Sequence, residues 1–83
     1  MRYFLVSYIK KPNGQIDEAV SLTKSLKKND YQTSNIIMDF KEKKVITCTV
    51  DGSRVDTDWD KLYAYYNQHY PNVIERLVSE ASQ

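Results

Sequence analysis

The sequence predicts an α+β domain with a four-stranded, mostly antiparallel sheet made of two hairpins. A C-terminal helix, broken at Pro71, follows the sheet and packs on one of its faces. Residues 2–10 are rich in aromatic and β-branched residues, and an Asn-Gly turn comes directly after them. From Trp59 onward, apolar side chains recur at spacings of three and four, which is the period of a helix. The 83 residues have the size of one domain, so residues 1–83 form a single small α+β domain.

The first strand is expected over residues 2–10. Apolar side chains occupy both of its alternating sets, which favours a strand inside a sheet with both faces at least partly covered. The turn comes next, because Asn13 and Gly14 tolerate positive φ and Pro12 cannot extend a ladder. This segment therefore begins a hairpin.

Residues 16–28 fit two interpretations. With period two, Ile16, Val20 and Leu22 share a face, and the segment is the return strand of the hairpin. With period 3.6, a stripe that includes Ile16, Val20 and Leu26 predicts a helix, and the order becomes β-α-β-β-α-α. The Asn-Gly turn after a strong strand favours the hairpin.

A second hairpin is expected from residues 31–40 and 45–50, with residues 41–43 as its loop. The cross-strand pairs would be Phe40 with Lys44, Met38 with Ile46, and Ile36 with Cys48. This register places the large apolar side chains on one face, except Ile37 and Val45. We expect those two side chains to face outward.

The clearest helix spans residues 58–69, with Thr57 as its N-cap and Asp58 and Asp60 in an acidic first turn. Pro71 interrupts the pattern, which starts again over residues 72–80. One helix face is aromatic and is expected to pack in the core, whereas Tyr65 points away from it. The aromatic side chains on that face are Trp59, Tyr63, Tyr66 and Tyr70.

The chemistry-bearing residue types are scarce. The chain has one His, one Cys and two Gly, which are too few for a zinc site or for a glycine-rich phosphate-binding loop. The spacing of the single Cys and the single His also gives no support for a catalytic Cys-His pair. We therefore expect no enzyme activity, no cofactor and no metal site. A single cysteine, Cys48, fits a reducing compartment, and no apolar run approaches the length of a membrane span. A cytoplasmic location without membrane contact follows as an expectation.

The charge pattern is polarised although the net charge is only +1. The first 44 residues carry nine basic and five acidic side chains, and the remaining residues carry three and six. Such a small net charge gives no global field of the kind that announces a nucleic-acid or membrane binder. The residue usage, rich in Lys, Tyr, Asn and Ile, is typical of A+T-rich coding sequences, as in bacteriophages or low-G+C bacteria. The expected location is then the cytoplasm of a bacterial host cell.

The leading functional hypothesis is a small, non-enzymatic interaction or regulatory protein that binds another protein or a second copy of itself. The candidate contact residues are Ile37, Val45 and Tyr65, because an apolar sheet face is expected to lack a cover.

Two alternatives remain open. The first is a weak nucleic-acid binder that uses lysines near two predicted turns. These lysines are Lys24, Lys27, Lys28, Lys41, Lys43 and Lys44. The second is a small-ligand or nucleotide-binding module in which Tyr and Trp rings stack on a base.

Overall fold

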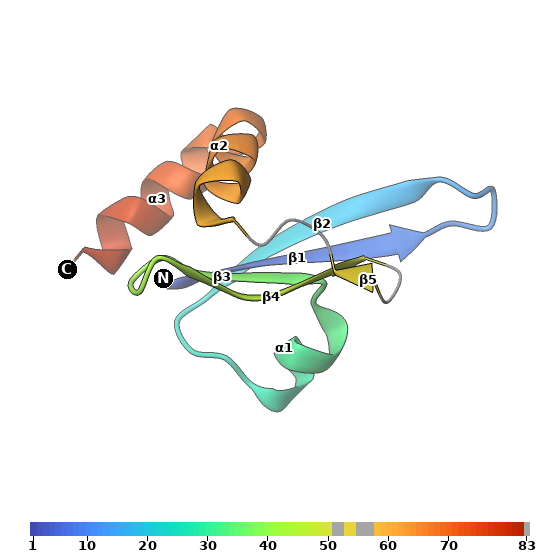
Figure 1. Cartoon of the computed structure of the whole chain (residues 1–83), viewed down its shortest axis with the longest axis horizontal. Helices are drawn as coiled ribbons and strands as arrows, with labels where there is room; N and C mark the ends of the chain where they lie inside the picture. The colour runs from blue at the N-terminus through green and yellow to red at the C-terminus, as the bar shows by residue number, and fades with distance from the viewer. Residues whose placement is uncertain (51–52, 55–57, 83) are drawn as a thin grey trace.

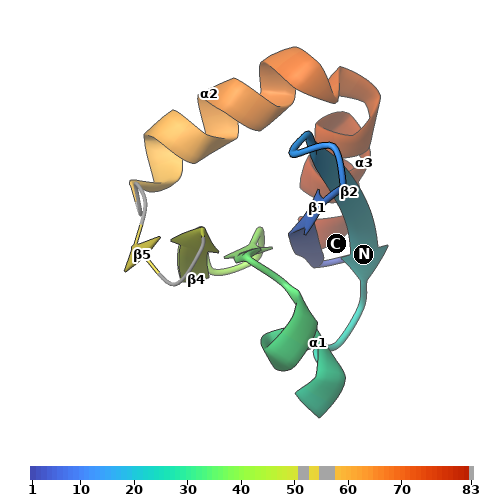
Figure 2. The ribbon, with the colours of Figure 1, turned by 90° about the vertical axis from the view of Figure 1, so that its right-hand side faces the viewer.

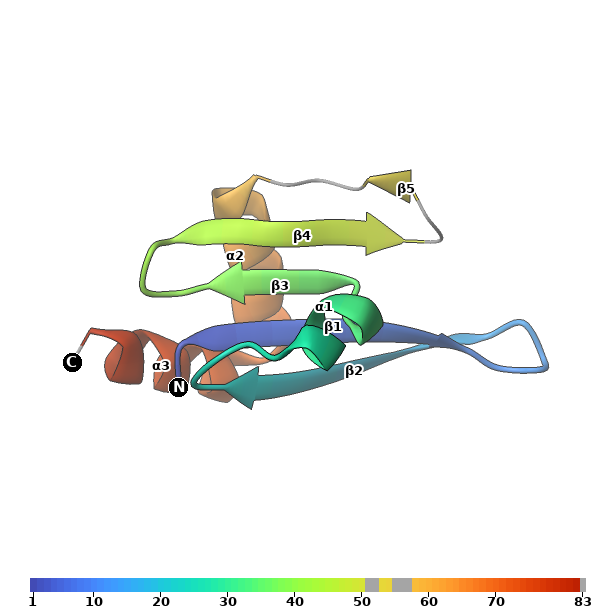
Figure 3. The same ribbon diagram turned by 90° about the horizontal axis from the view of Figure 1, so that it is seen from below.

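An open antiparallel sheet with strand order β2-β1-β3-β4-β5 forms the centre of the fold (Figure 3). The computed structural model describes residues 1–50, 53–54 and 58–82. The four main strands confirm the predicted α+β class and four-stranded sheet, and β5 adds a two-residue strand at one edge. The strands are β1 (Tyr3–Lys10), β2 (Ile16–Thr23), β3 (Ile36–Asp39), β4 (Lys44–Val50) and β5 (Ser53–Arg54).

The two faces of the sheet carry different helices. Helices α2 (Trp59–His69) and α3 (Pro71–Ala81) lie over one face, and the short helix α1 (Lys28–Thr33) lies on the other (Figures 1 and 2). The break between α2 and α3 falls at Tyr70, and Pro71 begins α3, where the missing N–H costs nothing. The predicted break at Pro71 is thus confirmed. The N-cap of α2 is Asp58, whose carboxylate accepts a hydrogen bond from the backbone N–H of Asp60, rather than Thr57, which lies outside the described residues.

The first hairpin forms as predicted. Gly14 has a φ of 87°, its N–H donates to the carbonyl oxygen of Lys11, and the side chain of Asn13 accepts from the N–H of Gln15. β1 and β2 then pair over eight consecutive residues. The helical interpretation of residues 16–28 is therefore wrong, although the strand ends at Thr23 instead of residue 28.

Helix α1 was not expected, because residues 31–40 were predicted to be strand throughout. The helix takes residues 28–33, and β3 begins only at Ile36. Its first turn is held by Asp30, whose carboxylate accepts a hydrogen bond from the backbone N–H of Lys27. Tyr31 is 55% exposed, so this helix is stabilised by its ends rather than by a buried stripe.

The β3–β4 hairpin contains a register shift between Ile37 and Met38. Ile36 pairs with Cys48 as predicted, but Met38 pairs with Val45 instead of Ile46. The loop has four residues, 40–43, and Lys43 lies in the left-handed region with a φ of 54°. The shift turns Val45 toward the helices, where it packs against the core, so the expectation that Val45 faces outward is wrong.

The core lies between the sheet and the helix pair. The aromatic face of α2 packs there as expected: the ring of Tyr66, 1% exposed, lies 5.0 Å from that of Phe4 in an edge-to-face arrangement. Trp59, Tyr63 and Tyr70 pack partly buried around it. The buried members of the core are Phe4, Val6, Ile36, Met38, Phe40, Cys48, Tyr66, Ile74 and Leu77.

The second face of the sheet is not bare. Leu5 and Ile37 are neighbours in the β1–β3 ladder, and they are 4% and 0% exposed. Helix α1 lies on this side of the sheet (Figures 1 and 3). Ile37 does face away from the helix pair, but the expectation that it is open to a partner is wrong.

Candidate functional site

A groove opens where three distant segments meet: the start of α2, the end of α3 and the β3–β4 turn. Its volume is about 460 Å³, within the range of ligand-binding pockets. Phe40, Trp59, Tyr63 and Val78 supply its apolar lining. We call this feature the aromatic groove.

The three rings of the aromatic groove support one another. The ring centroids of Phe40 and Trp59 are 4.9 Å apart in an edge-to-face arrangement, and that of Tyr63 lies 6.1 Å from Phe40 and 6.2 Å from Trp59. Phe40 is 5% exposed, and its backbone N–H donates to the carbonyl oxygen of Arg2. Phe40 is therefore a fixed base on which the half-buried rings of Trp59 and Tyr63 rest.

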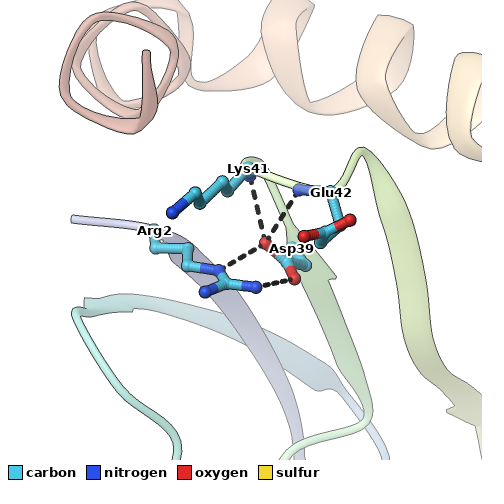
Figure 4. Close-up of polar contacts among 4 residues, drawn as sticks. All are labelled: Arg2, Asp39, Lys41 and Glu42. Atoms are coloured by element: carbon cyan, nitrogen blue, oxygen red, sulfur yellow. Dashed lines mark hydrogen bonds and ion pairs between the residues drawn. The ribbon is translucent and has the colours of Figure 1, made fainter. Parts of the chain in front are cut away.

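The turn that carries the groove's lysines is anchored by Asp39 (Figure 4). The guanidinium of Arg2 donates through Nε to Oδ1 and through Nη2 to Oδ2 of Asp39, at 2.8 and 2.7 Å. The same Oδ1 accepts hydrogen bonds from the backbone N–H groups of Lys41 and Glu42, at 3.0 and 3.3 Å. The hydrogen bonds from Arg2, and then those from the backbone, hold the pKa of the buried Asp39 carboxyl below its usual value. The turn is thus held rigidly against β1.

Two amines line the aromatic groove beside its rings. Lys41 and Lys43 belong to the β3–β4 turn, and within the described part of the chain neither ammonium group has an ion-pair partner. Asp60, in the first turn of α2, also lines the groove. The nearby carboxylate of Glu80 is already engaged, because it pairs with the N-terminal ammonium group and with Arg76. The groove therefore combines apolar rings with two amines that are open to an anionic group.

A smaller cavity of about 320 Å³ adjoins this region. Lys24 and Lys41 both line it, together with Arg2 and Glu80. Lys24 follows β2 and Lys41 follows β3, so two lysines from separate turns do meet at one end of the sheet. Lys44 begins β4 at the same end, where it pairs with Asp39 in the register.

The remaining predicted lysines lie elsewhere. Lys27 and Lys28 cap and begin α1, which lies on the opposite face of the sheet from α2 and α3 (Figure 1). Both side chains are exposed. The six lysines of the predicted nucleic-acid site therefore do not form one continuous array.

The predicted partner residues do not come together either. Tyr65 is 48% exposed on α2, and its ring lies 4.3 Å from that of His69. Ile37 is buried and Val45 packs on the core, as described above. Only Tyr65 is available for contact.

A second polar cluster joins β2 to the helix pair. The hydroxyl of Tyr70 donates to Oε2 of Glu18 at 2.6 Å, and the hydroxyls of Tyr8 and Tyr66 lie 3.2 Å apart. The hydrogen bond to Glu18 is the main cause that raises the pKa of Tyr70 to about 12, and burial is the main cause that raises the pKa of Tyr66. This cluster holds the two layers together and stabilises neutral tyrosines.

The spacing of the aromatic residues on α2 predicts that Trp59 and Tyr63 pack in the core, and it does not predict a groove beside their rings. Val78 belongs to the apolar pattern of α3, yet it is 46% exposed beside the rings. The sequence of α3 alone does not distinguish the buried Leu77 from the exposed Val78.

Comparison of the chain with protein-family models, with curated proteins and with solved structures found no match. Among residues 1–50, 53–54 and 58–82, no helix is long and apolar enough to cross a membrane. The same residues contain no group of three or more His, Cys, Asp or Glu side chains arranged to hold a metal ion.

Proposed function

We propose that this chain is a small, non-enzymatic interaction protein that binds a segment of another protein in the aromatic groove. The observation that carries the proposal is the incomplete burial of Trp59, Tyr63 and Val78 directly beside the amines of Lys41 and Lys43. Trp and Tyr side chains are enriched among the residues that contribute most of the binding free energy at protein interfaces.

The groove favours a partner segment with a particular chemistry. A large apolar side chain would complete the burial of the rings and of Val78. An Asp or Glu next to that side chain would meet Lys41 and Lys43. The partner segment is therefore an acidic peptide with an aromatic or large aliphatic anchor.

The two alternatives have less support. A polyphosphate backbone prefers Arg forks, but the one Arg beside the lysines, Arg2, is committed to Asp39. The carboxylate of Asp60 in the groove repels every phosphate of a polyphosphate chain, whereas a peptide with a single Asp or Glu can place that one carboxylate beside the lysines. These features disfavour a nucleic acid or a nucleotide and agree with a peptide of mixed character.

The proposal is tested by selection from a random peptide library on the immobilised protein. We expect enriched peptides to carry a large apolar residue next to Asp or Glu. Val78→Glu should weaken their binding about tenfold or more, because it places a carboxylate on the apolar wall. Ser79→Glu is the matched control, since this substitution adds the same charge at the next residue of α3, which is also exposed.

Isothermal titration calorimetry of the selected peptides provides the measurement. Equal loss of affinity in both variants, or enrichment of peptides that ignore Val78, would contradict the proposal. Salt-sensitive binding of single-stranded RNA or DNA that depends on Lys24 and Lys41 would replace it with the nucleic-acid alternative. A cytoplasmic location, in a bacterial host cell, is part of the proposed function.

A further inference from the structure

Strand β2 forms an open edge of the sheet. It pairs with β1 over eight residues without any register shift, and no strand of the described chain lies beyond it (Figure 3). Proteins usually guard such an edge with Lys, Pro, a bulge or a very short strand. Residues 16–23 contain no Lys and no Pro. The opposite edge, by contrast, ends in the two-residue strand β5.

The acidic side chains of β2 are not unpaired charges that would repel a second strand at this edge. Asp17 pairs with the ammonium group of Lys11 at 2.9 Å, and Glu18 accepts the hydroxyl of Tyr70 at 2.6 Å. Both carboxylates are therefore engaged within their own chain. The edge also carries an apolar side chain in the open, because Ile16 is 51% exposed.

The alternation of hydrogen bonds along β1 and β2 identifies the backbone groups of β2 that point to the open edge. The N–H of Lys11 donates to the carbonyl oxygen of Gln15, whereas the carbonyl oxygens of Arg2 and Val6 accept from the β3 side. Because bonding alternates along an antiparallel strand, odd-numbered residues of β1 and β2 bond to each other. The even-numbered residues Ile16, Glu18, Val20 and Leu22 thus direct their N–H and C=O groups to the open edge.

We propose that two copies of this chain pair antiparallel through β2, with a two-fold axis at Ala19. In this register the outward-bonding residues meet one another: Glu18 faces Val20 of the second copy, and Ile16 faces Leu22. Residues that face each other in an antiparallel pair lie on the same side of the sheet. Both helix pairs then cover the same face of one continuous sheet, and Ile16 gains an apolar neighbour.

Neighbouring registers are less favourable. An axis at Asp17 or at Glu18 sets two identical carboxylates against each other. An axis at Val20 places Ile16 opposite Lys24, and an axis at Ser21 leaves Ile16 without a partner strand. The axis at Ala19 therefore pairs residues 16–22 of both copies without opposed carboxylates, and it also gives Ile16 an apolar partner.

Cysteine cross-linking tests the register directly. Two Ala19 residues on the axis form a non-hydrogen-bonded pair with a Cα separation of about 4.5 Å, which suits a disulfide. Ala19→Cys should therefore form a covalent dimer under mild oxidation. Ser21→Cys is the matched control: it lies on the same face of β2, but the two copies of residue 21 would be about 13 Å apart. The native Cys48 is buried and common to both variants.

A second pair of variants tests the association itself by analytical ultracentrifugation. The unmodified protein should sediment as a dimer that weakens on dilution. Ile16→Lys should raise its dissociation constant about tenfold or more, because it introduces an edge lysine. Ile9→Lys should leave it within about twofold, since Ile9 is equally exposed on the hairpin but belongs to the paired strand β1.

A monomer at the highest soluble concentration would overturn the proposal and leave the edge to a strand from a different protein. A dimer that Ser21→Cys cross-links as readily as Ala19→Cys would overturn the register and the proposal with it. The pairing uses no residue of the aromatic groove, so its failure leaves the proposed function standing.

Discussion

Arg2 and Asp39 form a two-pronged ion pair that joins the start of β1 to the end of β3, with both N–O distances below 2.9 Å. Asp39 is 1% exposed and is the one buried charged residue in the described core. Its carboxylate binds the backbone of the next turn as well. A single side chain therefore fixes both the sheet and one wall of the aromatic groove.

Replacement of this carboxylate should destabilise the fold. Asp39→Ala leaves the N–H groups of Lys41 and Glu42 without their acceptor, which should lower the free energy of unfolding by about 2 kcal/mol. Urea denaturation followed by circular dichroism measures the change. Glu42→Ala is the control, because it keeps the backbone N–H and removes only an exposed carboxylate. An equal loss in both variants would show that Asp39 does not anchor the turn.

The same carboxylate should make stability depend on pH in the acid range. The pKa of Asp39 in the folded protein is lowered, mainly by its hydrogen bonds from Arg2. Its stabilising effect is therefore complete above the unfolded-state pKa of about 4 and is lost as the pH falls further, through the folded-state pKa. The urea midpoint should drop below pH 4 in the native protein and drop less in Asp39→Asn. Parallel curves for the two proteins would contradict this assignment.

The lysines of the aromatic groove should control the affinity of acidic peptides. Lys41→Glu combined with Lys43→Glu should weaken binding of a selected peptide by about tenfold, and high salt should reduce the difference. Lys27→Glu combined with Lys28→Glu makes the same charge change at α1 and should alter the affinity little. Isothermal titration calorimetry at low and high salt measures both pairs. If the α1 pair has the larger effect, the binding surface lies on the other face of the sheet.

The hydroxyl of Tyr70 should contribute to the contact between β2 and the helices. Tyr70→Phe removes the 2.6 Å hydrogen bond to Glu18 and should cost about 1 kcal/mol of unfolding free energy. Because the folded-state pKa is raised to about 12, this contribution is present below pH 10 and is lost as the pH rises toward 12. Chemical denaturation at pH 8 and at pH 11 measures the difference. Tyr65→Phe, at an exposed position of α2, should change the stability little.

Much of the fold follows from local signals in the sequence. Asn13-Gly14 specifies a tight turn, and the eight-residue pairing of β1 with β2 follows from it. The apolar spacing from Trp59 and the proline at residue 71 predict two consecutive helices. Each of these signals depends on residues that are close together in the sequence, so the turn and the two helices can be predicted without a structure.

The sequence does not predict the features of the fold that depend on tertiary contacts. A six-residue helix such as α1 is too short to show a period, and Lys27 is not a typical N-cap. The alternation of apolar and polar residues in β4 fits a β3–β4 register with a bulge and one without. The side of the sheet on which Val45 lies therefore depends on which register buries more apolar surface. The sequence does not predict the aromatic groove, because the crossing of α3 over the sheet determines that Leu77 is buried and Val78 is exposed.

The contact between Phe40 and Trp59 also has an optical consequence. Trp59 is the single tryptophan of the chain, so its indole is the source of the long-wavelength emission of the folded protein. Seven tyrosines, several within a few ångströms of one another, can pass excitation energy to it. The emission of Trp59 should therefore change when a ligand enters the aromatic groove, so binding can be followed without an added dye.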